Sequence, residues 1–252
     1  MARFKVGIQL HPQATTTDSL QIAWQAADEL GADSIWVWDH FFPLYGEPDA
    51  SHFEAWSLLA AMAVTTKRAS FGAMVSCNSY RNADLVADMA RTIDHLSHGR
   101  FVLGLGAGWF ERDYDEYGYD FATAGQRLDA FEAALPRVRA RLGKLNPPPV
   151  GPLPLLIGGG GERRTLKLVA EHAQMWNTTS ADLEVISHKN YVLDQWCSKV
   201  GRDPAEIERS ALVFADPDVD AYLAAGITHL ILMAGQPFDL APLQRLLDIA
   251  NA

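Results

Sequence analysis

The sequence has few cysteines, no long apolar run and fewer basic than acidic side chains. Its 252 residues include two cysteines, Cys77 and Cys197, and no CxxC pair. Two cysteines cannot form the disulfide framework of a small secreted domain, and structural zinc sites need closely spaced Cys or His ligands. We therefore expect two reduced thiols in a cytoplasmic protein, and no metal site.

Apolar runs stay well short of the roughly 18 residues that a membrane span needs. The start of the chain is only briefly apolar, which fits a first strand better than a secretion signal. The chain has 31 Asp and Glu against 21 Lys and Arg, a formal net charge of −10. Because nucleic-acid binding needs a basic surface, we expect no nucleic-acid partner and no membrane partner. A small anionic ligand stays compatible with this charge if local amides and arginines bind it.

What the sequence does contain is a regular alternation of short apolar runs and helical patterns. Hydrophobic residues make up 48% of the chain, enough for a large core. Strands that alternate with helices indicate a parallel sheet. Eight strand–helix units in 252 residues predict a (β/α)8 TIM-like barrel that forms one domain over residues 1–252. A doubly wound open sheet is the alternative.

The predicted elements follow one another in pairs. We expect strands at residues 4–10, 34–38, 70–75, 101–105, 155–157, 174–177, 207–214 and 228–233. We expect helices at residues 18–30, 53–65, 83–96, 127–142, 162–171, 181–200, 218–225 and 240–250. Pro136 is expected to kink one of these helices. The proline-rich residues 146–154 are interpreted as a loop inside the barrel.

Functional groups of such a barrel lie on the loops that follow the strands. Asp39 and His40 follow the second strand, where a carboxylate beside an imidazole can bind a polar ring edge and move a proton. The structural alternative is an Asp that caps the backbone next to a buried, hydrogen-bonded His. The other histidines are scattered without metal-ligand spacing. Cys77 could pair with a His as in a hydrolase, but no Gly-x-Ser-x-Gly elbow or related motif supports this.

Two glycine-rich segments follow predicted strands. Four glycines, Gly158 to Gly161, precede an amphipathic helix, and Arg163 and Arg164 come directly after them. Backbone amides without side chains and a helix N-terminus favour a phosphate-binding loop, and a flexible turn is the alternative. The segment from Gly104 to Gly108 is neither a dinucleotide fingerprint nor a P-loop, and tight packing at a strand end explains it equally well.

At these same loops the sequence resembles the luciferase-like monooxygenase superfamily, which uses FMN or the deazaflavin coenzyme F420. It is most similar to the F420-dependent branch, over residues 4 to about 177. The resemblance rests on five stretches in this order: SIWVWDHFF at 34–42, SCNSYRN at 76–82, TIDHLSHGR at 92–100, LGLGAGW at 103–109 and PLLIGGGG at 154–161.

The resemblance implies a TIM-like barrel with the deazaflavin ring in its mouth. It implies that Asp39 contacts the ring and that His40 lies near the reactive carbon. Met74 and Val75 match a bulge with a non-prolyl cis peptide that backs the ring, and Cys77 matches a side chain at the ring edge. The coenzyme tail is assigned to Ala107, Gly108, Arg112, Gly158, Gly159, Gly160, Gly161 and Arg163.

The chain also departs from the family pattern. Sugar-phosphate dehydrogenases of the family have a catalytic Glu where this chain has Trp109, which argues against sugar-phosphate oxidation. The segment 143–153 is short, so a more open pocket is expected. His11, Trp109 and Trp176 are the predicted substrate-pocket residues, and their ring character favours an apolar or conjugated substrate. Relatives commonly form homodimers through the helices beside strands two and three.

Three hypotheses follow. In the first, the protein is an F420-dependent oxidoreductase in which His40 donates a proton and the coenzyme transfers hydride. In the second, it is an FMN-dependent monooxygenase on the same barrel. In the third, it binds F420 without catalysis. Because the coenzyme tail is anionic, the first hypothesis also expects Arg112, Arg163 and Arg164 to gather near one groove.

Overall fold

The computed structural model describes residues 2–252 and alternates strands with helices along that whole stretch. The strands are β1 (Lys5–Leu10), β2 (Ser34–Val37), β3 (Ser70–Ala73), β4 (Ser76–Cys77), β5 (Leu103–Gly106), β6 (Leu155–Gly158), β7 (Met175–Thr178), β8 (Glu208–Val213) and β9 (His229–Ala234). The helices are α1 (Thr17–Leu30), α2 (Ala55–Thr65), α3 (Ala83–Leu96), α4 (Glu111–Tyr117), α5 (Ala124–Leu142), α6 (Thr165–His172), α7 (Leu183–Val200), α8 (Val219–Ala224) and α9 (Ala241–Asn251). Two 3-10 turns, Asn78–Tyr80 and Pro204–Glu206, complete the elements.

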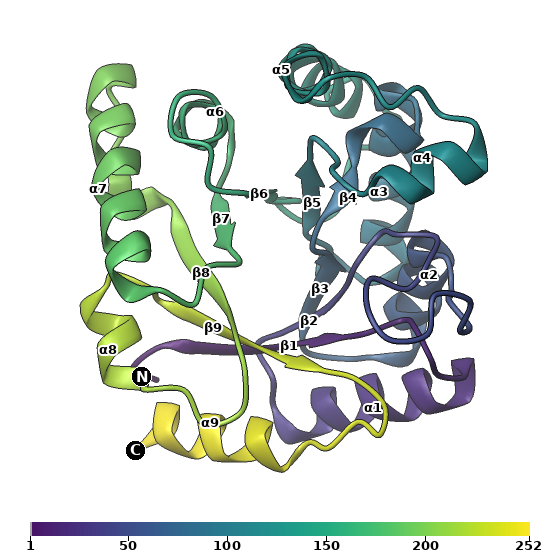
Figure 1. The fold of residues 1–252 in the computed structure, drawn as a ribbon, viewed down its shortest axis with the longest axis vertical. Helices are drawn as coiled ribbons and strands as arrows, with labels where there is room; N and C mark the ends of the chain where they lie inside the picture. Colours follow the sequence, from purple (N-terminus) through teal and green to yellow (C-terminus); the bar gives the residue numbers. More distant parts are fainter. Residues whose placement is uncertain (1) are drawn as a thin grey trace.

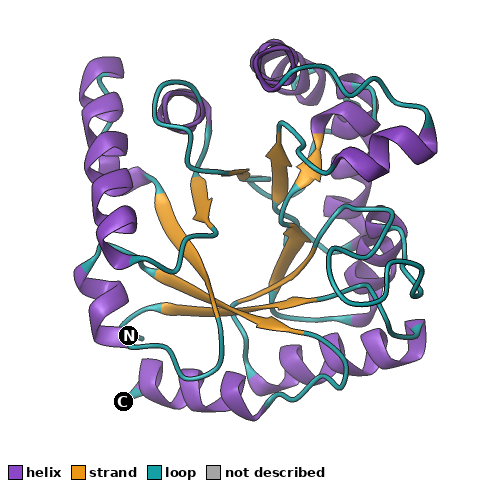
Figure 2. Cartoon of the chain, in the orientation of Figure 1, coloured by secondary structure: helices purple, strands orange, loops and turns teal. Residues whose placement is uncertain are grey.

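The strands form one parallel sheet that curls into a nearly closed barrel. Their order is β3-β2-β1-β9-β8-β7-β6-β5-β4, and the helices surround this sheet (Figures 1 and 2). The ends of the sheet meet where the Val102 amide donates to the Phe71 carbonyl over 2.9 Å. The predicted TIM-like barrel is confirmed.

The third predicted strand, residues 70–75, is divided into β3 and β4. The Met74–Val75 peptide bond between them is cis, as the family resemblance implies. The elements otherwise match the predicted ranges to within a few residues, with one omission. Helix α4 was not predicted, because its sequence ERDYDEY has no apolar periodicity. Pro136 lies inside α5, which continues past it to Leu142.

Apolar side chains fill both sides of the sheet. The larger cluster packs between the sheet and the helices, whereas a smaller one fills the barrel interior with Trp36, Met74, Val102, Leu156, Met175 and Ile231. Glycines make room for Val75 near the mouth: a Cβ on Gly106 would lie 2.6 Å from its Cγ2, and a Cβ on Gly158 would lie 2.9 Å from its Cγ1. The missing side chains therefore let the bulge after β3 reach across the barrel.

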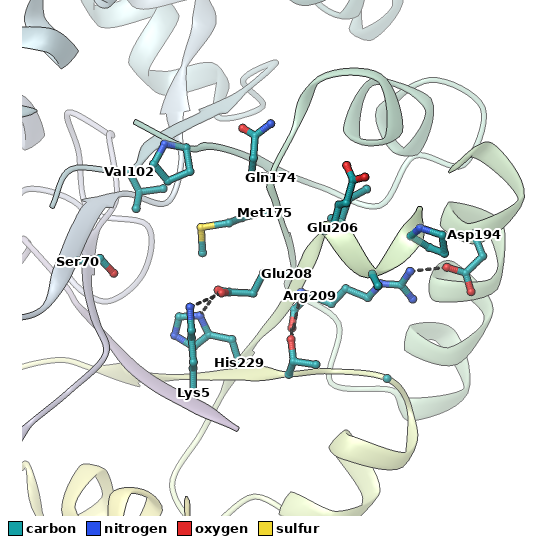
Figure 3. A pocket seen from close by; sticks show the side chains of 16 residues that line it. Lys5, Ser70, Val102, Gln174, Met175, Asp194, Glu206, Glu208, Arg209 and His229 are labelled. Atoms are coloured by element: carbon teal, nitrogen blue, oxygen red, sulfur yellow. Dashed lines mark hydrogen bonds and ion pairs between the residues drawn. The ribbon is translucent and has the colours of Figure 1, made fainter. Parts of the chain in front are cut away.

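A polar network closes the opposite end, where the strands begin. His229 Nδ1 lies 2.7 Å from Glu208 Oε1, its Nε2 lies 2.8 Å from Ser34 Oγ, and Lys5 Nζ donates to Glu208 Oε2 over 2.6 Å. Lys5, Glu208 and His229 border an open cavity of about 780 Å³ (Figure 3). Burial alone would raise the pKa of Glu208, but the bonds from His229 and Lys5 outweigh it and lower that pKa to about 2.

We predict that Glu208→Gln lowers the free energy of unfolding by about 1–3 kcal/mol at pH 7, because it removes the charge that Lys5 and His229 stabilise. The pKa of Glu208 is depressed in the fold, so its contribution is complete above about pH 4.5 and is lost as the pH falls toward 2. Urea unfolding at pH 7, 5 and 3.5 measures this loss. Glu206→Gln is the control, at a more exposed carboxylate paired with Arg202. An equal deficit at every pH would contradict the prediction.

Candidate active site at the barrel mouth

A buried carboxylate that the sequence analysis did not identify organises the mouth of the barrel. Asp113, in the first turn of α4, is fully buried, and its Oδ2 lies 2.6 Å from His40 Nδ1. The Tyr80 hydroxyl donates to the same oxygen over 2.8 Å. The amides of Phe41 and Phe42 donate to Oδ1 over 3.0 and 3.2 Å. These four donors satisfy the oxygens of a carboxyl group in a place that water does not reach.

This arrangement fixes the orientation of His40. A hydrogen bond from Nδ1 to Asp113 selects one tautomer and leaves Nε2 as the other ring nitrogen. Among residues 2–252, no protein group bonds Nε2. The rings of Trp109 and Phe110 stand edge-on to the imidazole, with centroids 5.6 and 5.4 Å away. His40 is therefore placed to exchange a proton through Nε2.

Asp39, the neighbour of His40 in the sequence, is bound by protein donors through both of its oxygens. Its two oxygens accept from Arg81 over 2.6 and 3.0 Å, the Cys77 amide donates to it over 3.2 Å, and its side chain is fully buried. Burial raises the pKa of the Asp39 carboxyl, and the Arg81 guanidinium opposes that rise. Arg81 also bonds Glu54 over 2.7 Å. This pairing joins β4 to the loop that follows β2, and a contact between Asp39 and the coenzyme ring stays a prediction.

Cys77 is an inert thiol in this setting. Its Sγ lies 3.1 Å from the Tyr114 hydroxyl, and burial raises its pKa. A Cβ on Gly108, whose φ is +81°, would lie 2.5 Å from the same sulfur. No His of the described chain hydrogen-bonds the thiol, so the geometry gives no support to a hydrolase pair.

The predicted pocket residue His11 lies beneath the loop that follows β2. Its ring stacks on Trp38 at 4.5 Å, and the Tyr45 hydroxyl hydrogen-bonds its Nδ1. Burial lowers the pKa of His11 to about 4 and raises the pKa of Tyr45 to about 12. His52 accepts from the Trp38 indole over 3.0 Å, and burial lowers its pKa to about 4 as well. Both imidazoles are thus neutral at pH 7, and the half-exposed Tyr45 covers His11.

The two predicted pocket tryptophans have different environments. Trp109 is 63% exposed and stands beside His40. Trp176 is fully buried in the core between sheet and helices, so its assignment to the substrate pocket is wrong. Side chains alternate along a strand, and in β7 it is Met175 that faces the barrel interior. The Trp176 indole instead donates to the Gly159 carbonyl over 2.7 Å and supports the glycine loop.

The loop of four glycines leads from β6 into α6. Gly159 has φ +111°, which favours glycine, and its amide donates to the Asn177 carbonyl over 3.1 Å. Helix α6 begins at Thr165, later than predicted, and no side chain caps its N-terminus. Its first amides therefore have no side-chain acceptor, which is the arrangement that binds anions at helix N-termini.

The three arginines expected to gather are held by different partners. Arg112 bonds the Pro48 carbonyl over 2.6 Å and Asp49 over 2.8 Å, and its guanidinium lies over the Phe42 ring. Arg164 pairs with Asp129 and Glu132 of α5, each over 2.8 Å. Arg163 is exposed. The three arginines thus share no acceptor among the described residues, and their gathering near one groove stays a prediction.

Comparison with known proteins places the chain in a family. The sequence profile described as luciferase-like monooxygenase matches residues 1–226. The chain belongs to the luciferase-like monooxygenase family. An F420-dependent hydroxymycolic acid dehydrogenase of Mycobacterium tuberculosis is 27% identical over 228 residues, which cover 83% of this chain and 62% of that protein. An uncharacterised protein of the same species is 27% identical over 167 residues, 60% of this chain and 58% of the relative.

A solved structure has the same fold over almost the whole chain. It is an F420-dependent secondary alcohol dehydrogenase in complex with an F420-acetone adduct, with a TM-score of 0.87 at 17% identity. The match covers 98% of this chain and 99% of that one. In contrast, the chain spans about three fifths of the length of the two curated family members named in the preceding paragraph.

Within residues 2–252, no helix combines the length and apolarity needed to cross a membrane, and no three His, Cys, Asp or Glu side chains are grouped to hold a metal ion.

We predict that Asp113→Asn lowers the free energy of unfolding by about 1–3 kcal/mol, because an amide cannot accept from all four donors. It should also leave His40 in a mixture of tautomers, which ring-nitrogen NMR shifts detect. Asp115→Asn, an exposed carboxylate on the same helix, is the control and should change neither. A single unchanged tautomer in the Asp113 variant would show that Asp113 does not orient His40.

Proposed function

We propose that the protein is an F420-dependent oxidoreductase that transfers hydride between the deazaflavin and a small-molecule substrate. The observation that carries this proposal is the placement of the His40–Asp113 pair and the glycine loop at the same end of the barrel. Names of relatives support it, since both the hydroxymycolic acid dehydrogenase and the secondary alcohol dehydrogenase are F420-dependent.

The residues at the mouth fit such a coenzyme. Gly158, Gly159, Gly160 and Gly161 have no side chains to cover their backbone amides between β6 and α6, and Arg163 follows them closely in the sequence. Met74, Val75 and Cys77 would border the ring, with Ala107, Gly108 and Arg112 beside the tail. When bound, the deazaflavin supplies a ring carbon that gives or takes hydride and reacts little with oxygen.

His40 does the acid–base work in this proposal. Asp113 holds Nδ1, so Nε2 can give a proton to a substrate oxygen or take one from it. Trp109 and Phe110 shield the imidazole on two sides, which limits its contact with water.

The substrate is proposed to be apolar or conjugated. Trp109 stands where sugar-phosphate dehydrogenases of the family have a catalytic Glu, and the rings beside it are those of Phe110 and His40. The hydroxymycolic acid dehydrogenase is named for a lipid substrate, which agrees with this surface.

We predict saturable binding of coenzyme F420 at micromolar concentration or below, measured by fluorescence titration of the purified protein. FMN should bind at least about tenfold more weakly. Tight FMN binding, a yellow protein and NADH-dependent oxygen uptake would instead identify an FMN-dependent monooxygenase. Tight F420 binding with a His40→Ala variant that matches the wild type in every assay would indicate a non-catalytic binding protein.

The same proposal includes a cytoplasmic homodimer. The helices beside strands two and three have exposed apolar side chains, with Val64 on α2 at 62% and Leu85 on α3 at 53%. Both cysteines are free thiols, as a reducing compartment favours.

We predict that Leu85→Asp converts the dimer into monomers in sedimentation velocity, because it places a charge in the apolar interface. Tyr191→Asp is the matched control, since Tyr191 is 61% exposed on α7, on the other side of the barrel (Figure 1). Loss of the dimer in the control, or a wild type that sediments as a monomer, would contradict the proposed interface.

A further inference from the structure

Helix α7 places Lys189 against the glycine loop, although the lysine and the loop lie far apart in the sequence. A Cβ on Gly160 would lie 3.6 Å from Lys189 Cε and 3.9 Å from its Cδ, so the aliphatic stem of the lysine runs alongside the loop. Its ammonium lies 2.5 Å from Oε1 of Glu162, the first residue after the four glycines. No sequence motif linked Lys189 to this loop, because only the packing of α6 against α7 brings them together.

Several contacts hold this arrangement in place. The Trp196 indole, also on α7, donates to the Glu162 carbonyl over 2.7 Å. His188 Nε2 lies 3.3 Å from the Glu162 carboxylate. The Lys189 side chain is 19% exposed, whereas that of Glu162 is 41% exposed. The carboxylate can therefore swing into solvent at small cost, and the ammonium, packed along the loop, stays.

The other basic residues near the loop are engaged elsewhere or point outward. Arg164 is held by Asp129 and Glu132, and Arg112 by Asp49. Lys189 is thus a cation that the packing holds against the glycines. Its acidic partner is Glu162, so an anion at the loop would compete with this carboxylate for the ammonium.

We infer that Lys189 binds the anionic tail of the coenzyme and that Glu162 competes with this tail for the lysine ammonium. The inference rests on the proposed function. The chemistry recognised is a phosphate or carboxylate oxygen, because a lysine ammonium donates to either as a point charge. On binding, the tail replaces Glu162 at Lys189, and Glu162 moves into water.

The test compares coenzyme affinities by fluorescence titration and needs no substrate. Lys189→Gln should weaken F420 binding about 5- to 20-fold, as expected for loss of one charge-assisted hydrogen bond, and Lys189→Arg should retain most of the affinity. Glu162→Gln should tighten binding about 2- to 5-fold, because the competitor has lost its charge. Lys167→Gln is the control: that lysine lies on α6 and pairs with Glu132 and Glu171.

Coenzyme fragments identify which anion Lys189 holds. The deazaflavin riboside, which has neither phosphate nor glutamates, should bind wild type and Lys189→Gln equally. A second fragment has the phosphate but no glutamates. If Lys189→Gln binds this fragment more weakly than the wild type does, Lys189 contacts the phosphate. If Lys189→Gln binds only the full coenzyme more weakly, Lys189 contacts the glutamate carboxylates. Thermal melts confirm that each variant is folded.

The outcomes separate the inference from the proposed function. If the wild type binds no F420, the proposed function is wrong and the inference falls with it. If the wild type binds F420 and Lys189→Gln binds it equally well, only the inference is wrong. An equal loss for the riboside and for F420 would show that Lys189 merely holds α7 in place. Weaker binding by Glu162→Gln would overturn the competition.

Discussion

The arrangement of the mouth depends on burying the charge of Asp113. A carboxylate removed from water is tolerated only when donors satisfy its oxygens, and here they come from the loop after β2 and from the 3-10 turn after β4. Asp113 itself sits on α4, so the requirement ties three separate segments together. Asp39 does the same where Arg81 and the Cys77 amide join the loop after β2 to β4. His40 follows Asp39 directly, and its bond to Asp113 fixes its orientation.

A second constraint is steric and comes from missing side chains. Val75 occupies space that Cβ atoms on Gly106 and Gly158 would fill, and a Cβ on Gly104 would lie 1.9 Å from the Ala73 carbonyl oxygen. Glycines on two neighbouring strands therefore decide how far the bulge between β3 and β4 reaches into the barrel. The charged network thus fixes the loops at the mouth, and the glycines fix the bulge beneath them.

The fold was predictable from periodicity, whereas the site was predictable only in part. Alternating strands and amphipathic helices predicted the barrel, and the loops after the strands located His40 and the glycines. Trp176 was misassigned because its position at a strand end does not say which face of β7 it occupies. Asp113 and Lys189 were missed because both lie on helices, where an acid or a lysine looks like ordinary surface. Only the packing of α4 and α7 against the loops gives them a role.

The net charge of −10 no longer conflicts with an anionic ligand. A charge count treats the surface as uniform, but coenzyme binding depends on groups within a Debye length of about 8–10 Å. At the glycine loop these are backbone amides, the uncapped start of α6 and Lys189. The amides carry partial positive charge whatever the side chains are, and Glu162 neutralises Lys189 until an anion arrives. A chain with a net negative charge can thus have a selective anion site. Only a ligand that both contacts the backbone amides and displaces Glu162 from Lys189 gains both interactions.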